Sequence, residues 1–400
     1  MAAKTLDQVG TSPTSPSRTF RGAKSGKRHS SLERRANFPA RKPIPVSGHF
    51  IGTMPVQQRH RFDVAALELY LRNRIEGFSG PLAVEQFRGG QSNPTYLLAG
   101  GGKRWVLRAK PGPAAKLLPS AHAVEREFRA ITALEEAGVP VPRAHCLCED
   151  ENVIGRSFYV MEYVEGRVLW DPSLPGMTPP EREAIYDEMN RVLAALHRVD
   201  YGAAGLSDFG KPGNYFARQI GRWSRQYQAS ETERIEAMDG LIAWLPEDVP
   251  AGDETVVVHG DYRLDNLVFH PREPRILAIL DWELSTLGHP LADFSYHCMS
   301  WHIPPGQFRG IAGLDLASLG IPSESQYIAS YCERTGRDAI EHWDFYLAYN
   351  LFRIAAILQG VMKRALDGTA ASAEALEAGG RARPLAELGW KYAEKSMGKK

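Results

Sequence analysis

The sequence predicts an α+β protein of two lobes, in which a small antiparallel sheet precedes a mainly helical part. Short runs of strand-forming residues gather between positions 82 and 166, and apolar residues at helical spacing dominate after position 166. The chain has 400 residues, of which 43% are hydrophobic, so it can bury a sizeable core in roughly two or three structural units. We therefore expect an N-lobe over 62–165 and a C-lobe over 166–397.

The first 61 residues form a basic extension that we expect to be disordered. They hold 12 Lys and Arg against two acidic residues and few large apolar side chains, too little apolar surface to offset the entropy of ordering the chain. A solvated arm is a simpler interpretation than a tail that binds nucleic acid. Met54 precedes the first amphipathic run, so a translation start at Met54 would remove nothing that we expect the fold to need.

Composition predicts a cytoplasmic protein without a membrane span. The most apolar run, 347–358, is interrupted by Asn350 and Arg353 and falls short of the ~20 residues that a span requires. The cysteines are too few for a disulfide framework and lack a zinc spacing, which indicates a reducing compartment; they are Cys146, Cys148, Cys298 and Cys332. We interpret Cys146 and Cys148 as packing residues on one face of a strand.

The N-lobe elements are expected in the order helix, hairpin, strand, helix and strand. After an amphipathic helix near 62–75, the pattern predicts strands at 82–87, 95–98, 104–108 and 158–166, with a helix at 121–137. A Gly-rich turn at 88–94 joins the first two strands. By itself this turn is weak evidence for phosphate binding, because hairpins use such turns routinely.

Helical spacing continues through the C-lobe, where we expect helices at 180–199, 214–228, 231–245, 323–335 and 339–366. The first of these carries Ile185, Met189, Val192 and Leu196 on one face, as a core helix does. It ends near His197, which we interpret as a hydrogen-bonding residue at the helix end.

Two short apolar runs, 256–258 and 276–280, each lead to a carboxylate. Asp261 follows the first run and Asp281 the second, so two adjacent strands could deliver both to one edge of a sheet. Asn266 lies just beyond the first. Moving a γ-phosphoryl group requires an Asp to orient and deprotonate a hydroxyl, and an Asn and a second Asp to hold Mg²⁺ on ATP. The two runs therefore predict a phosphoryl-transfer site.

The order His259-x-Asp261-x-x-x-x-Asn266, then Asp281 after an apolar strand, resembles the catalytic and metal-binding segments of the aminoglycoside phosphotransferase superfamily. The longer sequence from His259 through Asp293 is most similar to one subgroup, the kinase-like domain found alone in bacteria or ahead of acyl-CoA dehydrogenase domains. This resemblance covers about residues 62–397. It implies a bilobal protein-kinase-like fold, a nucleotide-binding N-lobe, a catalytic and acceptor-binding C-lobe, and ATP and Mg²⁺ as cofactors.

The resemblance implies a role for each polar residue of the C-lobe segments. Asp261 would be the base, Arg263 would face the transferred phosphate, and His259 would brace the loop rather than move protons. The metal ligands would be Asn266 and Asp281, with help from Glu283. Asp265 could assist the metal or be solvated, and Asp293 is expected to hold the loop beyond the metal site.

In the N-lobe, the resemblance implies a nucleotide site with three parts. Backbone N–H groups would cover the phosphates at Gly89, Gly90, Ser92 and Asn93. The connector residues Glu162, Tyr163 and Val164 would bind adenine through their backbone. Arg108 stands where kinases carry a phosphate-binding Lys, with Glu127 as its partner from the helix, and Arg is not equivalent to Lys. Lys110 and Glu125 remain rivals for this ion pair.

By resemblance, the acceptor is a small molecule, with a hydroxyacyl-CoA or a related hydroxy acid expected first. Anionic parts of such a substrate could contact Lys116, His122, Arg353 and Arg364. A separate acyl-CoA dehydrogenase would then process the product. An aminoglycoside or other amino alcohol is the alternative acceptor, although basic residues near the C-terminus disfavour a polycation.

Two further classes compete with a kinase. The first is a two-metal phosphoesterase, but the cluster holds only two histidines and Asn266 would be idle; its residues would be His259, Asp261, Asp265, Asp281, His289 and Asp293. A non-catalytic nucleotide-binding protein is the other, and the complete set of base and metal ligands argues against it.

Overall fold

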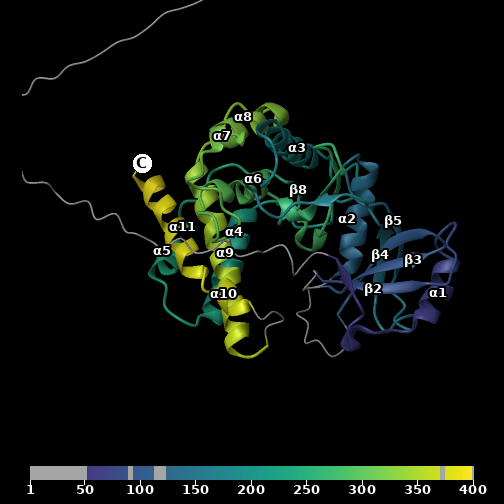
Figure 1. Ribbon diagram of the computed structural model, residues 1–400. Helices are drawn as coiled ribbons and strands as arrows, with labels where there is room; N and C mark the ends of the chain where they lie inside the picture. The colour runs from purple at the N-terminus through teal and green to yellow at the C-terminus, as the bar shows by residue number, and fades with distance from the viewer. Residues whose placement is uncertain (1–51, 89–92, 112–122, 370–373, 399–400) are drawn as a thin grey trace, which may run out of the picture. The chain divides into compact units, whose positions relative to one another are not determined.

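In the computed structural model, six antiparallel strands form the sheet that the sequence predicts for the N-lobe (Figure 1). In spatial order they are β1 (Thr53–Met54), β2 (Ala83–Phe87), β3 (Thr95–Gly100), β4 (Lys103–Ala109), β6 (Phe158–Glu162) and β5 (Ala144–Cys148). The structure describes residues 52–88, 93–111, 123–369 and 374–398. The Gly89, Gly90 and Ser92 positions of the predicted phosphate turn, and Lys116 and His122, lie outside these residues.

One helix covers each face of this sheet. Helix α1 (Val64–Arg72) shares a hydrophobic cluster with Trp105 and Leu107 of β4. Helix α2 (Val124–Glu136) lies on the other face, where Val106 joins the core that continues into the C-lobe. Because successive strand residues point to opposite faces, Arg108 faces the same side as Val106. The alternation thus directs Arg108 toward α2.

The folded chain begins earlier than the predicted boundary at residue 62. Strand β1 pairs with β2, with Thr53 opposite Phe87, and the phenol of Tyr96 donates a hydrogen bond to the backbone carbonyl of His60 at 3.0 Å. The assignment of residues 53–60 to a disordered extension is therefore wrong, and a start at Met54 would remove half of β1. A two-residue strand is held by backbone bonds, which leave no apolar periodicity in the sequence to detect.

The C-lobe is mainly helical. Its helices are α3 (Pro179–His197), α4 (Tyr215–Ser230), α5 (Glu236–Trp244), α6 (Pro290–Cys298), α7 (Leu316–Leu319), α8 (Glu324–Thr335), α9 (Trp343–Leu366), α10 (Ala375–Gly379) and α11 (Ala382–Met397). The five predicted helices are present. We did not predict α6, because all nine of its residues are buried and it has no polar face to create a period.

Helix α9 is the central helix of the C-lobe. It contacts α4, α6, α10 and α11. By length and composition it could cross a membrane, but 78% of its most apolar window is buried inside the fold. The interruptions at Asn350 and Arg353 are buried too, so this helix is apolar because it lies in the core.

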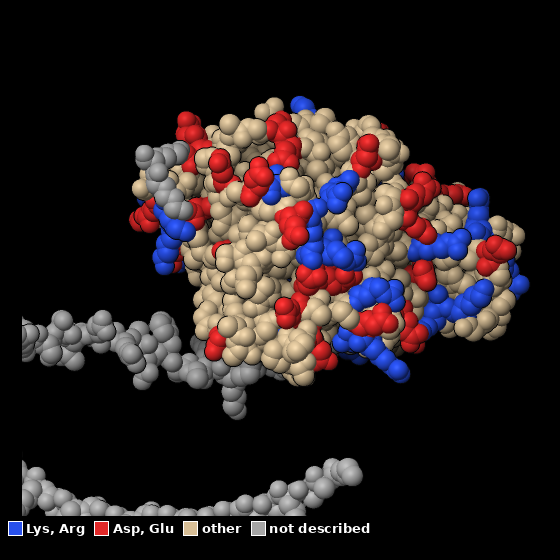
Figure 2. All heavy atoms as spheres, turned by 90° about the horizontal axis from the view of Figure 1, so that it is seen from above, with Lys and Arg blue, Asp and Glu red and all other residues tan. Residues whose placement is uncertain are grey.

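Charged side chains of both signs share the surface. On the face shown in Figure 2, Lys and Arg lie beside Asp and Glu. Across the surface as a whole, ion pairs join charged side chains of different elements. Examples are Arg334 with Asp187 at 2.6 Å and Arg383 with Glu233 at 2.7 Å. This face is therefore mixed in sign, as a solvated surface usually is.

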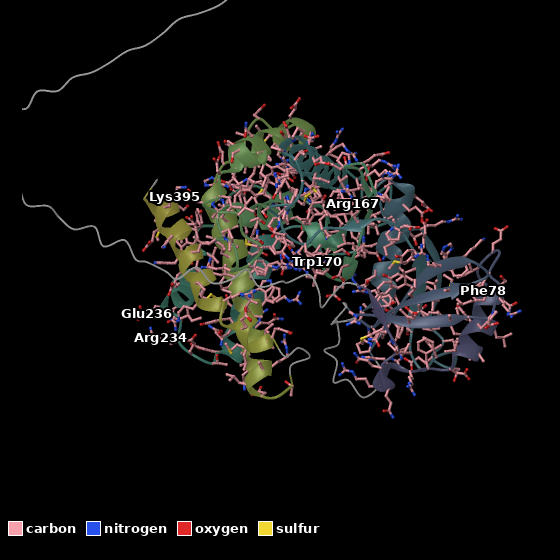
Figure 3. All side chains as sticks on the ribbon, in the orientation of Figure 1. Phe78, Arg167, Trp170, Arg234, Glu236 and Lys395 are labelled. Atoms are coloured by element: carbon pink, nitrogen blue, oxygen red, sulfur yellow. The ribbon has the colours of Figure 1, made fainter. Side chains whose placement is uncertain are left out.

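Two small sheets carry the predicted catalytic segments. Strand β8 (Val256–Val258) pairs with β11 (Thr286–Gly288), whereas β9 (Leu267–Phe269) lies between β10 (Ile276–Ile279) and β7 (Arg167–Val168). Figure 3 labels Arg167, the first residue of β7, and Trp170, which follows the strand. The runs before Asp261 and Asp281 are therefore not adjacent strands, and that expectation is wrong. A strand of three or four residues can pair with several other strands, so its sequence alone does not specify the partner.

Candidate active site

Buried side chains hold the loop that carries Asp261. The Asp293 carboxylate accepts hydrogen bonds from the backbone N–H groups of His259 at 2.7 Å and Gly260 at 2.8 Å. Gly260 has a φ of 82°, and a Cβ there would lie 2.8 Å from the carbonyl oxygen of Leu284. Only glycine fits this turn without strain. Burial acts to raise the pKa of Asp293, yet the hydrogen bond and charge of His197 hold it below its ordinary value.

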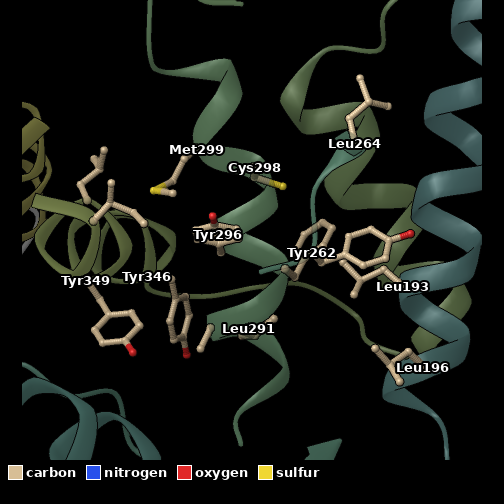
Figure 4. Packing of buried hydrophobic residues seen from close by; sticks show 14 of the residues in the cluster. Leu193, Leu196, Tyr262, Leu264, Leu291, Tyr296, Cys298, Met299, Tyr346 and Tyr349 are labelled. Atoms are coloured by element: carbon tan, nitrogen blue, oxygen red, sulfur yellow. The ribbon is translucent and has the colours of Figure 1, made fainter. Parts of the chain in front are cut away.

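Tyr262 fastens the next part of the loop to α3. Its side chain is fully buried, and its phenol donates to the carbonyl of Met189 at 2.9 Å. Figure 4 shows Tyr262 packed near Leu193 of α3, with Tyr296 of α6 beside it. The apolar core thereby fixes the backbone on either side of Asp261.

His259 braces this loop, as the sequence suggested. Its Nε2 lies 2.9 Å from the carbonyl of Leu280, and its Nδ1 accepts the N–H of Asp261 at 3.2 Å. A ring with an acceptor at Nδ1 carries its proton on Nε2, where it can donate to Leu280. The imidazole therefore ties the two segments together.

The Asp261 carboxylate is held at both oxygens. The phenol of Tyr296 donates to Oδ1, while Asn266 Nδ2 donates to Oδ2 at 3.1 Å and Arg263 Nε lies 3.0 Å from the same oxygen. Tyr296 was missed at the sequence level, because α6 shows no pattern. These contacts orient the carboxylate while leaving its side chain 15% exposed.

Asp265 joins two guanidinium groups. Its Oδ2 pairs with Arg309 Nη2 at 2.7 Å, and its Oδ1 lies 3.6 Å from Arg263 Nε. Burial raises the pKa of Asp265 to about 6, against the lowering effect of Arg263. Asp265 thus contacts both Arg309 and Arg263, and Arg263 in turn contacts Asp261.

The predicted metal ligands meet through strand register. Ile279 pairs with Leu267, and the N–H of Leu280 donates to the carbonyl of Asn266 at 2.8 Å, so Asp281 follows directly beside Asn266. Arg108 reaches this site from the N-lobe, with Nη2 2.6 Å from Asp281 Oδ1 and 3.2 Å from Glu283 Oε2. Two of the three predicted oxygen donors, Asp281 and Glu283, thus contact the guanidinium of Arg108, whereas the Asn266 side chain bonds to Asp261.

Both rival ion pairs of the N-lobe form, but they differ in burial. Arg108 Nε lies 2.8 Å from Glu127 Oε2, with side chains 10% and 1% exposed. Lys110 pairs with Glu125, with side chains 31% and 27% exposed. Glu127 also accepts hydrogen bonds from Asn93 Nδ2 at 2.8 Å and from the phenol of Tyr159 at 3.1 Å. The buried pair is therefore the one that reaches the Asp281 site.

The predicted adenine connector follows directly after the sheet. Strand β6 ends at Glu162, and the guanidinium of Arg104 lies 4.2 Å from the ring centroid of Tyr163. Val164 follows, half-buried, two residues before Gly166. A Cβ at Gly166 would lie 2.3 Å from the carbonyl of Phe269, so the chain enters the C-lobe in close contact with β9.

Arg353 does not lie where a substrate contact was expected. Its side chain is buried in α9, Nη2 donates to the carbonyl of Gly260 at 2.6 Å, and the guanidinium lies 5.2 Å from the ring centroid of Tyr296. It therefore holds the Asp261 loop instead of facing an acceptor. Arg364 is exposed near the end of α9.

A family model described as the phosphotransferase enzyme family matches residues 83–337, which include the Asp261 loop, the Asp281 segment and Arg108 but not Arg353. The chain belongs to this family. The matched span contains the Arg108–Glu127 pair, the Asp261 loop and the Asp281 segment, so the family and the geometry concern the same residues.

Several known proteins are similar to this phosphotransferase. A crystal structure from Ralstonia eutropha JMP134, provisionally described as an aminoglycoside phosphotransferase, is 64% identical, with a TM-score of 0.78 over 84% of this chain and 99% of that one. "Acyl-CoA dehydrogenase family member 10" of Mus musculus is 48% identical over 91% of this chain but only 34% of its own length. The chain thus spans about a third of that relative.

The fold is also shared with more distant enzymes. A spectinomycin phosphotransferase, crystallised with ADP and spectinomycin, is 11% identical, with a TM-score of 0.56 over 82% of this chain and 98% of that one. Together with the six-stranded sheet and the helical C-lobe, this similarity confirms the predicted bilobal kinase-like fold.

The donor set of this phosphotransferase fits a hard divalent cation. Asn266 offers an amide oxygen, and Asp281 and Glu283 offer carboxylates, which is the ligand type that Mg²⁺ takes from proteins. The residues that a two-metal phosphoesterase would need are engaged otherwise. His259 binds Leu280, and Asp293 holds the backbone of the loop.

A pocket opens beside the Asp261 loop. Arg263 and Tyr296 line it, together with Arg309 and the aromatic side chains of Trp170, Tyr186, Trp301 and Phe308. Sequence reasoning identified Arg263 alone among these. Nothing in the spacing of the others signals a shared site, because they come from four separate segments of the chain.

Proposed function

We propose that this protein is an ATP- and Mg²⁺-dependent kinase that phosphorylates a hydroxyl group of a small molecule, with a hydroxyacyl-CoA or related hydroxy acid as acceptor. The observation that carries the proposal is the orientation of the Asp261 carboxylate. Tyr296, Asn266 and Arg263 hold it beside the predicted metal ligands. Phosphoryl transfer depends mainly on such positioning.

In the proposed reaction, the acceptor oxygen attacks the γ-phosphorus of ATP as the bond to the bridging oxygen of ADP breaks. The Asp261 carboxylate aims the hydroxyl and takes its proton. Arg108 would contact the nucleotide phosphates, and Arg263 would face the transferred group. Mg²⁺, held by Asn266 and Asp281 with Glu283 nearby, would neutralise charge on the phosphates.

The nature of the pocket supports an acyl acceptor. Aromatic walls and two guanidinium groups suit an apolar chain with a neutral or anionic end. An aminoglycoside carries several positive charges and would be repelled by the same guanidinium groups. The curated relatives are named acyl-CoA dehydrogenases and are longer than this chain, which supports a separate acyl-CoA dehydrogenase as the partner that consumes the product.

The test is ATP consumption against hydroxyacyl-CoAs, free hydroxy acids, aminoglycosides and amino alcohols. We expect turnover with the first two classes and a loss of about 10²-fold or more in Asp261→Ala. If Asp261→Ala turns over as fast as the wild type with every acceptor, the kinase mechanism is wrong. Phosphorylation of kanamycin-like compounds alone would favour the amino-alcohol alternative. Tight ATP binding without turnover would indicate a non-catalytic protein.

A further inference from the structure

The aromatic pocket borders the groups that bind Asp261. Arg263 and Tyr296, which contact the two oxygens of the Asp261 carboxylate, are both part of its wall. Much of the remaining wall is aromatic or aliphatic, including Trp170, Trp301 and Phe308. The pocket encloses about 40 Å³, which is room for about three groups of the size of a water molecule, so a short segment of a hydrocarbon chain placed there could present a hydroxyl to Asp261. Each CH₂ group buried there would improve affinity by roughly fourfold.

Arg309 is held in this wall at a conformational cost. It is a non-glycine residue with a φ of 47°, in the left-handed region that side chains rarely adopt. Such a conformation persists only where the surroundings fix it, and it gathers at ligand-binding and active sites. Here the fixing contact is the ion pair with Asp265, a side chain that is only 4% exposed.

The guanidinium of Arg309 retains binding capacity after this contact. The bond to Asp265 uses Nη2, whereas a guanidinium has five N–H donors on three nitrogens. Its side chain is 27% exposed and lines the pocket. A carbonyl or carboxylate oxygen that enters the pocket can therefore accept a hydrogen bond from it.

The charges around the pocket disfavour a cation. The carboxylates of Asp261 and Asp265 are both engaged by Arg263, and Asp265 also by Arg309. An entering ammonium group would meet two guanidinium groups and carboxylates that already have partners. An oxygen acceptor would meet donors instead.

We propose that this pocket binds a segment of the acyl chain of the acceptor, and that Arg309 selects acceptors that carry a carbonyl oxygen in addition to the reacting hydroxyl. This proposal rests on the kinase function proposed above. The carbonyl can belong to a thioester or to a free carboxylate, and both offer the same oxygen to Arg309. Arg309 is thus a specificity-determining residue for the acceptor.

The first test compares Arg309→Gln with a matched control, Arg381→Gln. Arg381 is 32% exposed and forms an ion pair at 2.9 Å with Glu377, and neither residue lines the pocket. Acceptors are a γ-hydroxyacyl-CoA, its free hydroxy acid, and an alcohol of equal chain length without a carbonyl. We expect Arg309→Gln to raise KM by about tenfold or more for the carbonyl-bearing acceptors, the range expected for a hydrogen bond to a charged group.

The same variant should lose at least about tenfold less kcat/KM with the plain alcohol than with the carbonyl-bearing acceptors, and Arg381→Gln should match the wild type throughout. A loss with the thioester, the free acid or both supports the proposal and identifies the source of the oxygen. An equal loss with all three acceptors would mean that Arg309 acts only on the structure, and would overturn it.

A second test measures acyl-CoA binding in the absence of turnover. Two of the eight tryptophans of the chain, Trp170 and Trp301, line the pocket, so an acyl-CoA without a hydroxyl should change tryptophan fluorescence saturably, with affinity rising with chain length. Ser300 also lines the pocket, so Ser300→Phe, which places a ring in that space, should weaken this binding about tenfold or more. Thermal unfolding confirms that the variants are folded.

The two proposals fail in different ways. If no acceptor is phosphorylated but acyl-CoA binding depends on Ser300 and Arg309, the kinase function is wrong and the acyl pocket stands. If hydroxyacyl-CoA is phosphorylated while Ser300→Phe and Arg309→Gln leave its KM unchanged, the pocket proposal is overturned and the kinase function stands.

Discussion

Replacing Arg108 with methionine should destabilise the fold far more than the same change at its neighbour Lys110. Arg108 joins the buried Glu127 of α2 to Asp281 of the C-lobe, with contacts of 2.8 and 2.6 Å. Methionine fills similar space but removes the charge. Glu127, whose side chain is 1% exposed, would then be a buried carboxylate without its guanidinium partner.

The expected size of the effect follows from this burial. Breaking a buried ion pair by removing one partner costs about 3–5 kcal/mol, because the remaining charge is uncompensated. Glu127 keeps its hydrogen bonds from Asn93 and Tyr159, so we expect a value near the lower limit, about 3 kcal/mol. The Lys110–Glu125 pair is about a third exposed, and exposed pairs contribute about 0–1 kcal/mol.

The assay is urea denaturation at pH 7 of Arg108→Met, Lys110→Met, Glu127→Gln and the double variant at 108 and 127. Because Glu127→Gln removes the uncompensated charge, the double variant should be more stable than Arg108→Met alone. Equal losses of unfolding free energy in the two methionine variants would refute the reasoning, since burial would then not decide between the pairs. So would a double variant in which the two losses simply add.

Three further results are expected. Asp293→Asn should lower the free energy of unfolding by about 1–3 kcal/mol, because the N–H groups of His259 and Gly260 bond to different carboxylate oxygens and an amide replaces one of these with an NH₂ donor. The pKa of Asp293 lies below its ordinary value of 3.8, so its stabilising effect is present above that pH and is lost below it. In urea titrations, the difference in unfolding free energy between the wild type and Asp293→Asn should be smaller at pH 3 than at pH 7. An unchanged difference would contradict this. Asp281→Asn should raise the Mg²⁺ concentration for half-maximal turnover by about tenfold or more, and an unchanged Mg²⁺ dependence would exclude Asp281 as a ligand. Arg353→Met should lower kcat by about 10–100-fold with acceptor KM unchanged, because Arg353 holds the loop; a rise in KM alone would place it at the substrate after all.

Local patterns were sufficient for much of the fold. The buried residues of helix α2 recur at helical spacing, and strands β3 and β4 follow the Gly-rich turn in the predicted order. The short motif at 259–266 identifies chemistry because carboxylate and amide side chains at that spacing suit phosphoryl transfer. Such signals lie within a few residues of one another.

Other features left no local signal. Helix α6 is buried on every side, so its sequence lacks the polar face that would reveal it, and with it Tyr296. In the sequence Arg353 interrupts an apolar run, whereas in the structure it binds the Asp261 loop from within the core. Strand β8 contains three valines that could pair with several partners, and packing selects β11.

The sequence by itself determined the order of the elements, the residues able to carry phosphoryl-transfer chemistry and the family to which they belong. Only the tertiary structure decided which side chains meet: that Arg108 reaches Asp281, 173 residues further along the chain, that Tyr296 binds the Asp261 carboxylate, and that Arg309 pairs with Asp265 in the pocket wall. The physical reason is that periodicity and turn chemistry act between near neighbours. Ion pairs and pocket walls instead form between distant segments, which come together only when the core packs.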